Sequence, residues 1–421
     1  MDYKETIKEL KENIYSWENI QYICELVVLW WVLCWASDIH IEPLSTFIRI
    51  RYRVDWELKE ILEYQHFLHQ WIVARYKILA DLKIDETRIP QDWKISQTVW
   101  EKPVELRFSS LPTVTWEKLV FRIIDKSKKT PSLDVLWIEW HNMDLIRKAI
   151  SLPNWVILTS WPTWSWKSTT LFSCLLELNT PDVNIMTLED PVENQIDWIA
   201  QSQVKPDIWY TFASWVRAAL RQDPDIILVW EMRDKETLEI WVEASLTWHL
   251  VLSTIHTNSA AETITRVIQM WLPPFMIPAS FNIVIAQRLI RRLCPHCKKE
   301  VQLKDLAPSV LKNVKNAISL TSKEEIENRV AEEIKNPKFY EPVWCEKCEN
   351  VWYKWRVWLY EVLEITDSIK QAIINEESAF NINKKAILDW MVSLEQDWIM
   401  KALKWLTSLE EVYSVAKTQN W

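Results

Sequence analysis

The chain has 421 residues, with 49 basic and 58 acidic side chains, and its net charge at pH 7 is −9. This length accommodates two or three domains with cores of their own, and the acidic balance argues against general nucleic-acid binding while leaving room for a local basic groove. The N-terminus lacks the features of a signal peptide, and the longest apolar run, from Leu26 to Ala36, is too short to cross a bilayer. We therefore expect a cytosolic protein.

The composition has one anomaly: the chain contains no glycine and 30 tryptophans. At the average usage of about 7%, a chain of this length would carry about 30 glycines. Trp56 and Trp93 each follow an aspartate in a turn-like context, where glycine is favoured and an indole does not fit. We interpret the tryptophans as glycine positions, encoded by UGA codons that specify glycine and have been read as tryptophan. The alternative is a genuinely tryptophan-rich chain.

The N-terminal part reads as strands and turns with some helix. Residues 48–56 (I-R-I-R-Y-R-V-D-W) and 118–125 (K-L-V-F-R-I-I-D) alternate as half-exposed strands do. Residues 126–135 are polar and contain a proline, which is typical of a linker. We expect an α+β domain that, with this linker, spans residues 1–135.

From Trp155 the pattern changes to short apolar strands followed by helices. Strands are predicted at 156–159, 183–188, 226–229 and 250–255, and polar residues follow them, as the binding residues do in open α/β sheets. The predicted α/β core spans 136–290. Residues 299–341 form a Lys/Glu-rich segment that we expect to be helical, and the region 364–421 is also expected to be helical, from Ile365 to Lys417.

Residues 159–170 read T-S-W-P-T-W-S-W-K-S-T-T. With glycine for tryptophan they contain the pattern G-x-x-x-x-G-K-S/T of a phosphate-binding loop, between a predicted strand and a predicted helix. The predicted nucleotide-binding residues are Pro162, Thr163, Trp164, Ser165, Trp166, Lys167, Ser168 and Thr169. Lys167 stands where the β- and γ-phosphates are contacted, and Ser168 where Mg²⁺ is bound. With true tryptophans the backbone could not close around phosphate and the site would be inactive.

An acid, Glu231, follows the apolar strand at 226–229 and Trp230. A single acid in this place is more often only a solvated turn residue. Together with a phosphate-binding loop, it is typical of a residue that holds Mg²⁺ or polarises the attacking water.

Two C-x-x-C pairs, Cys294/Cys297 and Cys345/Cys348, offer four thiolates in the arrangement of a structural zinc site. We expect a zinc-binding module at 291–363. A redox function is the alternative, disfavoured because neither pair lies at a strand–helix junction. The other three cysteines, Cys24, Cys34 and Cys174, are isolated in apolar surroundings and are predicted to be buried.

Taken together, these motifs resemble the secretion and pilus-assembly ATPases, the hexameric motors of type II secretion and type IV pili. The resemblance runs from about Ala36 to the C-terminus. It rests on A-S-D-I-H-I-E-P at 36–43 (N-domain signature), T-L-E-D-P-V-E at 187–193 (aspartate box), Trp230-Glu231 (the end of Walker B) and T-W-H-L-V-L-S-T-I-H-T-N at 247–258 (histidine box). Every departure within these motifs is tryptophan for glycine.

The resemblance implies a RecA-like ATPase core that uses ATP, Mg²⁺ and Zn²⁺, in a homohexamer on the inner-membrane face that moves a platform protein. Glu231 would activate water, with Glu189, Asp190 and Glu193 supporting the metal and the water. His249 and His256 would sense the γ-phosphate or the neighbouring subunit. Three arginines would contact nucleotide: Arg217 in the core, and Arg107 and Arg122, which the N-terminal domain would bring to the γ-phosphate on closure. Without the resemblance, a strand arginine is by default a solubilising charge and a lone histidine a structural residue.

Four rival functions remain. A pilus-retraction ATPase is disfavoured by the cysteine pairs, and a DNA-uptake pilus motor is not distinguished from an assembly motor. A nucleic-acid translocase is disfavoured by the net charge, and a non-catalytic subunit requires true tryptophans. The further N-terminal docking domain found in many of these ATPases is expected to be missing from this sequence.

Overall fold

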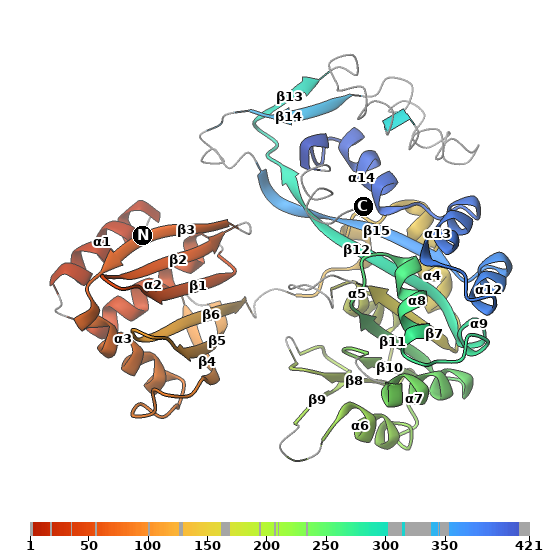
Figure 1. Cartoon of the computed structure of the whole chain (residues 1–421), viewed down its shortest axis with the longest axis horizontal. Coiled ribbons are helices and arrows are strands. Elements are labelled where there is room, and N and C mark those ends of the chain that lie inside the picture. Colours follow the sequence, from red (N-terminus) through yellow and green to blue (C-terminus); the bar gives the residue numbers. More distant parts are fainter. Residues whose placement is uncertain are drawn as a thin grey trace. The chain divides into compact units, whose positions relative to one another are not determined.

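The computed structural model describes residues 3–16, 19–34, 36–54, 57–99, 102–125, 129–160, 169–192, 195–205, 208, 210–232, 235–301, 314–315, 338–343, 345 and 353–411. The chain divides into two compact units, Met1–Lys129 and Thr130–Trp421. This division falls within the segment 126–135 that the sequence suggests as a linker. Figure 1 shows the elements of the two units.

The N-terminal unit is one antiparallel sheet with three helices. In chain order its elements are α1 (Tyr3–Ser16), α2 (Ile20–Cys34), β1 (Asp38–Pro43), β2 (Ile48–Val54), β3 (Glu57–Tyr64), α3 (His66–Leu79), β4 (Gln91–Val99), β5 (Lys102–Pro112) and β6 (Glu117–Asp125). The strand order is β3-β2-β1-β6-β5-β4. The predicted strands at 48–56 and 118–125 are confirmed as β2 and β6.

Alternation within the strands gives this sheet one apolar and one charged face. In β2, Ile48, Ile50 and Tyr52 are fully buried, while the arginines between them are partly exposed. The apolar face packs against the three helices, and the Tyr52 hydroxyl donates to the Val27 carbonyl of α2 at 2.6 Å. Cys24 is buried in this core, as predicted, and burial raises the pKa of its thiol to about 12.

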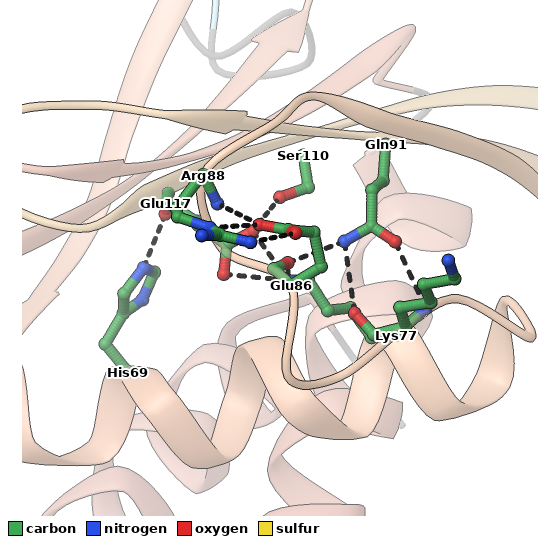
Figure 2. A network of polar contacts seen from close by, with 8 residues as sticks. His69, Lys77, Glu86, Arg88, Gln91, Ser110 and Glu117 are labelled. Carbon is green, nitrogen blue, oxygen red and sulfur yellow. Dashed lines mark hydrogen bonds and ion pairs between the residues drawn. The ribbon is translucent and has the colours of Figure 1, made fainter.

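A buried ion pair ties α3 to the hairpin of β5 and β6 (Figure 2). Lys77 has no exposed surface, and its Nζ lies 2.7 Å from a carboxylate oxygen of Glu117. The same carboxylate accepts from the Ser110 hydroxyl at 2.6 Å, while Lys77 also donates to the Glu86 carbonyl at 2.8 Å. Because the charges are mutually compensated and hydrogen-bonded, we interpret this network as structural.

The C-terminal unit is an α/β sheet with helices on both faces. Its elements before the first cysteine pair are η1 (Leu133–Val135), α4 (Trp140–Ile150), β7 (Trp155–Ser160), α5 (Thr169–Leu178), β8 (Ile185–Glu189), β9 (Ala200–Gln203), α6 (Phe212–Ala219), β10 (Ile226–Val229), α7 (Lys235–Leu246), β11 (Leu250–Ile255), α8 (Ala260–Gln269), α9 (Met276–Ser280) and β12 (Phe281–Leu293). They are followed by β13 (Lys298–Val301), β14 (Phe339–Pro342), β15 (Tyr353–Glu364), α12 (Asp367–Ile374), α13 (Ala379–Leu388) and α14 (Leu394–Leu403). The seven-stranded sheet has the order β15-β12-β7-β11-β10-β8-β9, and all neighbours pair in parallel except β15 with β12.

The central strands are apolar on both sides because each side carries helices. In β7, Val156 and Leu158 face a core that includes residues of α6 to α9, whereas Ile157 faces α4 and α5. The four strands predicted for this region are confirmed as β7, β8, β10 and β11. Cys174, on α5, is buried as predicted.

Two expectations for the C-terminal region need correction. Both ends of the segment 299–341 are strands, since β13 and β14 pair antiparallel; helix was predicted from the Lys/Glu content, which does not show that the two ends pair with each other. The division at residue 290 also falls inside β12, and β15 joins the core sheet beside β12. The helical tail is confirmed as far as α14.

The backbone supports the glycine interpretation of the tryptophans. Eleven described residues have positive φ, and eight of them are tryptophan: Trp137, Trp155, Trp198, Trp248, Trp271, Trp355, Trp390 and Trp405. Seven of these φ angles lie between 59° and 79°. A bulky side chain is an outlier there, whereas glycine adopts such angles at no steric cost. The side chain of Trp271 is 78% exposed, so packing does not explain its conformation.

Two buried tryptophans give separate support for the glycine interpretation. Trp241 on α7 and Trp398 on α14 are almost fully buried, yet the indole N–H of each has no hydrogen-bond partner. Buried indole N–H groups normally have a partner. Glycine would remove both unsatisfied donors, so these positions also favour the glycine interpretation.

Candidate active site

Four parallel strands bring the predicted site residues to one edge of the sheet. The strands β7, β8, β10 and β11 run in the same direction, so Ser160, Glu189, Glu231 and His256 lie at or just beyond their carboxyl ends (Figure 1). The residues Pro162, Thr163, Trp164, Ser165, Trp166, Lys167 and Ser168 lie outside the described residues. The strand predicted before them and the helix predicted after them are confirmed as β7 and α5, which begins at Thr169.

The segments flanking this loop are anchored by hydrogen bonds that the sequence does not reveal. The Thr170 hydroxyl donates to Oε1 of Gln287 at 2.6 Å and lies 3.1 Å from the Tyr360 hydroxyl. The Ser160 hydroxyl donates to the Thr257 carbonyl at 3.3 Å. The start of α5 and the end of β7 are therefore fixed to β12, β15 and the histidine-box loop.

Glu231 and His256 form a close pair at this edge. The Nε2 atom of His256 lies 3.0 Å from Oε1 of Glu231, which is 9% exposed. The backbone on both sides of Glu231 is bonded to neighbouring strands, from Trp230 N to Leu188 O and from Met232 N to Thr254 O, each at 2.9 Å. A carboxylate fixed in this way beside an imidazole can orient and polarise a water molecule.

Glu189 is fully buried at the end of β8, next to this pair in the sheet. Its Oε1 accepts from the Thr187 hydroxyl at 2.7 Å and from Nε2 of Gln201 at 2.8 Å. Asp190, which precedes a cis peptide bond to Pro191, is exposed. Glu193 lies outside the described residues.

The structure does not bring His249 to the Glu231 edge. His249 precedes β11, whereas His256 follows it, so the two histidines lie at opposite ends of one strand. The Nδ1 atom of His249 lies 3.0 Å from the Ala244 carbonyl. Arg217, on α6, donates to Glu236 of α7 at 2.5 Å on an exposed surface.

In the N-terminal unit, three cations lie side by side on the charged face of the sheet. Lys94 on β4 is directly opposite Arg107 on β5, which in turn is directly opposite Arg122 on β6. The Nε atom of Arg122 donates to Oδ1 of Asp38 at 3.2 Å. Like charges in directly opposed positions destabilise a sheet. Acids offset part of this repulsion, since Nε of Arg107 also lies 3.9 Å from Oε1 of Glu105, and the row of cations is a candidate anion-binding surface.

The second of the two acids in the signature at 36–43 is held by the same charged face. Glu42 accepts from Nε of Arg51 at 2.7 Å and from Nζ of Lys118 at 2.9 Å. Burial by itself would raise the pKa of Glu42, but these two hydrogen bonds and charges lower it to about 2. Glu42 is therefore ionised at neutral pH and fixed within the sheet.

The described cysteines of the two C-x-x-C pairs converge. The Sγ atoms of Cys294, Cys297 and Cys345 all lie within 4.8 Å of one another, and Cys294 and Cys297 are buried. The Val343 amide donates to the Cys297 carbonyl at 3.0 Å, which joins the two pairs. Cys348 lies outside the described residues.

Comparisons with known proteins identify the family. The family described as "Type II/IV secretion system protein" matches residues 21–414. The "Type II secretion system ATPase E" of Vibrio cholerae serotype O1 is 40% identical over 382 residues, which cover 91% of this chain and 72% of that protein. The "Type IV pilus assembly ATPase PilB" of Pseudomonas aeruginosa is 40% identical over 383 residues, which cover 91% of this chain and 65% of that protein.

Solved structures have the same fold. The ATPase DotB of Legionella pneumophila superposes with a TM-score of 0.66 over 94% of this chain and 95% of DotB, at 19% identity. The pilus retraction motor PilT with bound ADP gives a TM-score of 0.60 over 93% of this chain and 96% of PilT, at 22% identity. The matched family and the relatives at 40% identity together show that this chain is a member of the Type II/IV secretion system protein family.

Proposed function

We propose that this protein is a hexameric motor that hydrolyses ATP to drive assembly of a type IV pilus or a type II secretion pseudopilus. Its relatives at 40% identity carry the names of secretion and pilus-assembly ATPases, so we assign ATP hydrolysis to this chain. In this proposal it acts at the cytoplasmic face of the inner membrane, on a platform protein. Within the described part of the chain, no helix combines the length and apolar character needed to span a bilayer.

The pairing of Glu231 with His256 is the observation that carries the proposal. It lies at the sheet edge where the loop with Lys167 also begins and ends. Lys167 would neutralise phosphate charge, Glu231 would position the attacking water, and His256 would respond to the γ-phosphate through its contact with Glu231. Hydroxyl and carboxylate oxygens are the ligands that Mg²⁺ prefers, and Ser168, Glu189 and Asp190 would supply them on phosphate binding.

The opposed Arg107 and Arg122 support a second element of the mechanism. Their mutual repulsion is relieved when an anion binds between or above them, so a triphosphate brought to this face would be attracted by both. We propose that ATP binding draws the N-terminal unit to the nucleotide and that hydrolysis releases it. Because this attraction depends on the bound nucleotide, each cycle of ATP binding and hydrolysis would close and reopen the N-terminal unit and so perform mechanical work. His249, at the opposite end of β11 from His256, would act towards the neighbouring subunit of the ring, and Arg217 would contact nucleotide.

The cysteine cluster fits a structural zinc site. In a tetrahedral site with Zn–S bonds of about 2.3 Å, the sulfur atoms are about 3.8 Å apart, and the three described Sγ atoms lie within 4.8 Å of one another. Cys294, Cys297 and Cys345, with Cys348 as the fourth ligand, would hold the ion. Its role would be to join the end of β12 to the segment that leads into β15.

ATP turnover by purified protein that carries glycine at the tryptophan positions tests the proposal. We expect Mg²⁺-dependent hydrolysis and a hexamer in size-exclusion chromatography with nucleotide. A folded protein that binds no ATP would contradict the enzymatic function. Steeply salt-dependent DNA binding would instead favour a translocase.

A further inference from the structure

The strand β12 ends its pairing with β7 beside the phosphate-binding loop. Ala286 is the partner of Ser160, the last residue of β7, so Gln287 and Arg288 come directly beyond it. Successive side chains point to opposite faces of a sheet. Gln287 accordingly reaches Thr170 of α5 on one face, and Arg288 reaches Asn258, just before α8, on the other.

Arg288 holds the loop that carries His256. Its Nη2 donates to the Asn258 carbonyl at 2.5 Å and lies 3.3 Å from the Asn258 side-chain oxygen. The backbone N–H of Asn258 donates to the Glu262 carboxylate at 3.0 Å, so both backbone polar groups of Asn258 are hydrogen-bonded. His256, two residues earlier, makes the 3.0 Å contact with Glu231. His256 is therefore at the start of a short loop that Arg288 anchors together with Ser160, which donates to the Thr257 carbonyl.

The burial of Arg288 is costly. Its side chain is 6% exposed, and its Nε and Nη1 atoms are buried with no hydrogen-bond partner. Burial lowers the pKa of Arg288 to about 10, partly offset by the charges of Glu361 and Glu262, so it stays charged at neutral pH. A buried guanidinium with incomplete hydrogen bonding is usually less favourable than an apolar side chain of similar size. A requirement beyond stability would explain why arginine occupies this position.

A second anchor connects the same region to the C-terminal helices. Glu361, on β15, is directly opposite Ala286 and so lies on the same face of the sheet as Arg288. Its two carboxylate oxygens accept from the Ala260 amide at 2.9 Å and from the Leu394 amide at 3.2 Å. Glu361 thus joins the first turns of α8 and α14. The loop 256–259 therefore lies between the end of β11 and a fixed start of α8.

We infer that Arg288 is a positioning residue for hydrolysis, which keeps His256 in contact with Glu231 through its bond to the Asn258 carbonyl. This inference rests on the proposed ATPase function. Loss of the bond would let the loop shift, and a misplacement of about 1 Å in a catalytic group can lower a rate by about 100-fold. Nucleotide binding would be largely preserved, since Arg288 is on the face of the sheet opposite to α5.

A double-mutant cycle in the full chain tests the inference. We expect Arg288→Met to lower kcat by about 10- to 100-fold with little change in the KM for ATP. Combined with His256→Ala, it should cause little further loss, because both changes act at one contact. Arg288→Lys, which retains one donor for the carbonyl, should restore part of kcat.

The control is Arg291→Met on the same strand, since Arg291 is also partly buried and pairs with Glu411 at 2.6 Å. Its effect should multiply with that of His256→Ala. A normal kcat in Arg288→Met, or a multiplicative effect with His256→Ala, would overturn the inference. So would a loss of kcat in Arg288→Met where His256→Ala shows none.

A second readout does not need turnover. The ring resonances of His256, assigned by their loss in His256→Ala, should move in Arg288→Met at fixed pH and stay in place in Arg291→Met. If they do not move, Arg288 does not position His256, whatever the turnover. If they move while the parent protein hydrolyses no ATP, the proposed function fails and the positioning contact stands.

Discussion

The Nε2 atom of His256 lies 3.0 Å from Oε1 of Glu231, and the two residues lie just beyond the carboxyl ends of two neighbouring parallel strands, β11 and β10. The contact joins the end of Walker B to the histidine box, two motifs with 15 residues between them in the sequence. A movement of either side chain on nucleotide binding would therefore displace the other. Substitutions at this edge of the sheet can therefore distinguish nucleotide binding from hydrolysis.

The first prediction separates binding from hydrolysis. Lys167→Ala should lose ATP binding, because Lys167 neutralises phosphate charge, whereas Glu231→Gln should bind ATP and lose turnover, because it acts at the attacking water. Isothermal titration of nucleotide and steady-state turnover measure the two effects. Undiminished turnover in Glu231→Gln would refute the role assigned to Glu231.

The position of the motifs at the carboxyl ends of the strands could be predicted from sequence, because runs such as I-I-L-V before Trp230 and Glu231 identify buried parallel strands. The separation of His249 from His256 could not be predicted as readily. The two residues share one motif, yet the fully extended strand Leu250–Ile255 lies between them and places them at opposite edges.

The anchoring residues were also beyond prediction. Arg288 contacts Asn258, 30 residues away, and Thr170 contacts Gln287, 117 residues away. The sequence signal for these contacts is the polar pair Gln287-Arg288 inside the apolar strand Phe281–Leu293, which indicates that both side chains have polar partners. Such contacts follow from the order of strands in the sheet, which a single sequence does not specify.

A second prediction concerns the opposed arginines. Arg107→Ala and Arg122→Ala should each lower kcat sharply, on the order of 10³-fold if they act as arginine fingers do. Stability should change little, since removing one of two opposed like charges relieves repulsion but also removes the contact of Arg122 with Asp38 or of Arg107 with Glu105. Arg49→Ala, on β2 of the same face, is a suitable control that should retain turnover. Near-normal rates in both the Arg107 and Arg122 variants would exclude the proposed closure mechanism.

The third prediction is a zinc content of one ion per chain, measured by atomic emission. Cys345→Ser should lose the ion and destabilise the segment around β13 and β14, because zinc binding contributes on the order of 10 kcal/mol to the folding of small modules. Cys174→Ser, at a buried cysteine far from the cluster in sequence, is the control and should retain zinc. A metal-free protein of undiminished stability would contradict the site.

The fourth prediction is a pH dependence that arises from Glu42. Its pKa is lowered to about 2 in the folded protein, against 4.5 as the usual value. A carboxyl with a depressed folded-state pKa contributes stability above its unfolded pKa, and this contribution is lost as pH falls through the folded pKa. The urea midpoint of the N-terminal unit should therefore fall between pH 4.5 and 2, and less so in Glu42→Gln. Parallel curves for the two proteins would show that other groups determine acid unfolding.

The last prediction concerns the tryptophans themselves. Eight of the eleven described residues with positive φ are tryptophan, a residue that this backbone conformation disfavours, and two further tryptophans bury indole N–H groups without partners. Glycine accounts for both observations and restores the phosphate-binding pattern between β7 and α5. We therefore expect the protein isolated from its native cells to be several kilodaltons lighter than the 50.5 kDa calculated for this sequence. Peptide mass spectrometry localises the change: the tryptic peptide 236–266, which holds Trp241 and Trp248, should be lighter by two tryptophan-to-glycine differences. The tryptophan-free peptide 305–312 should have its calculated mass. If the peptide 236–266 also has its calculated mass, the tryptophans are real, and the loop around Lys167 cannot close on phosphate as proposed.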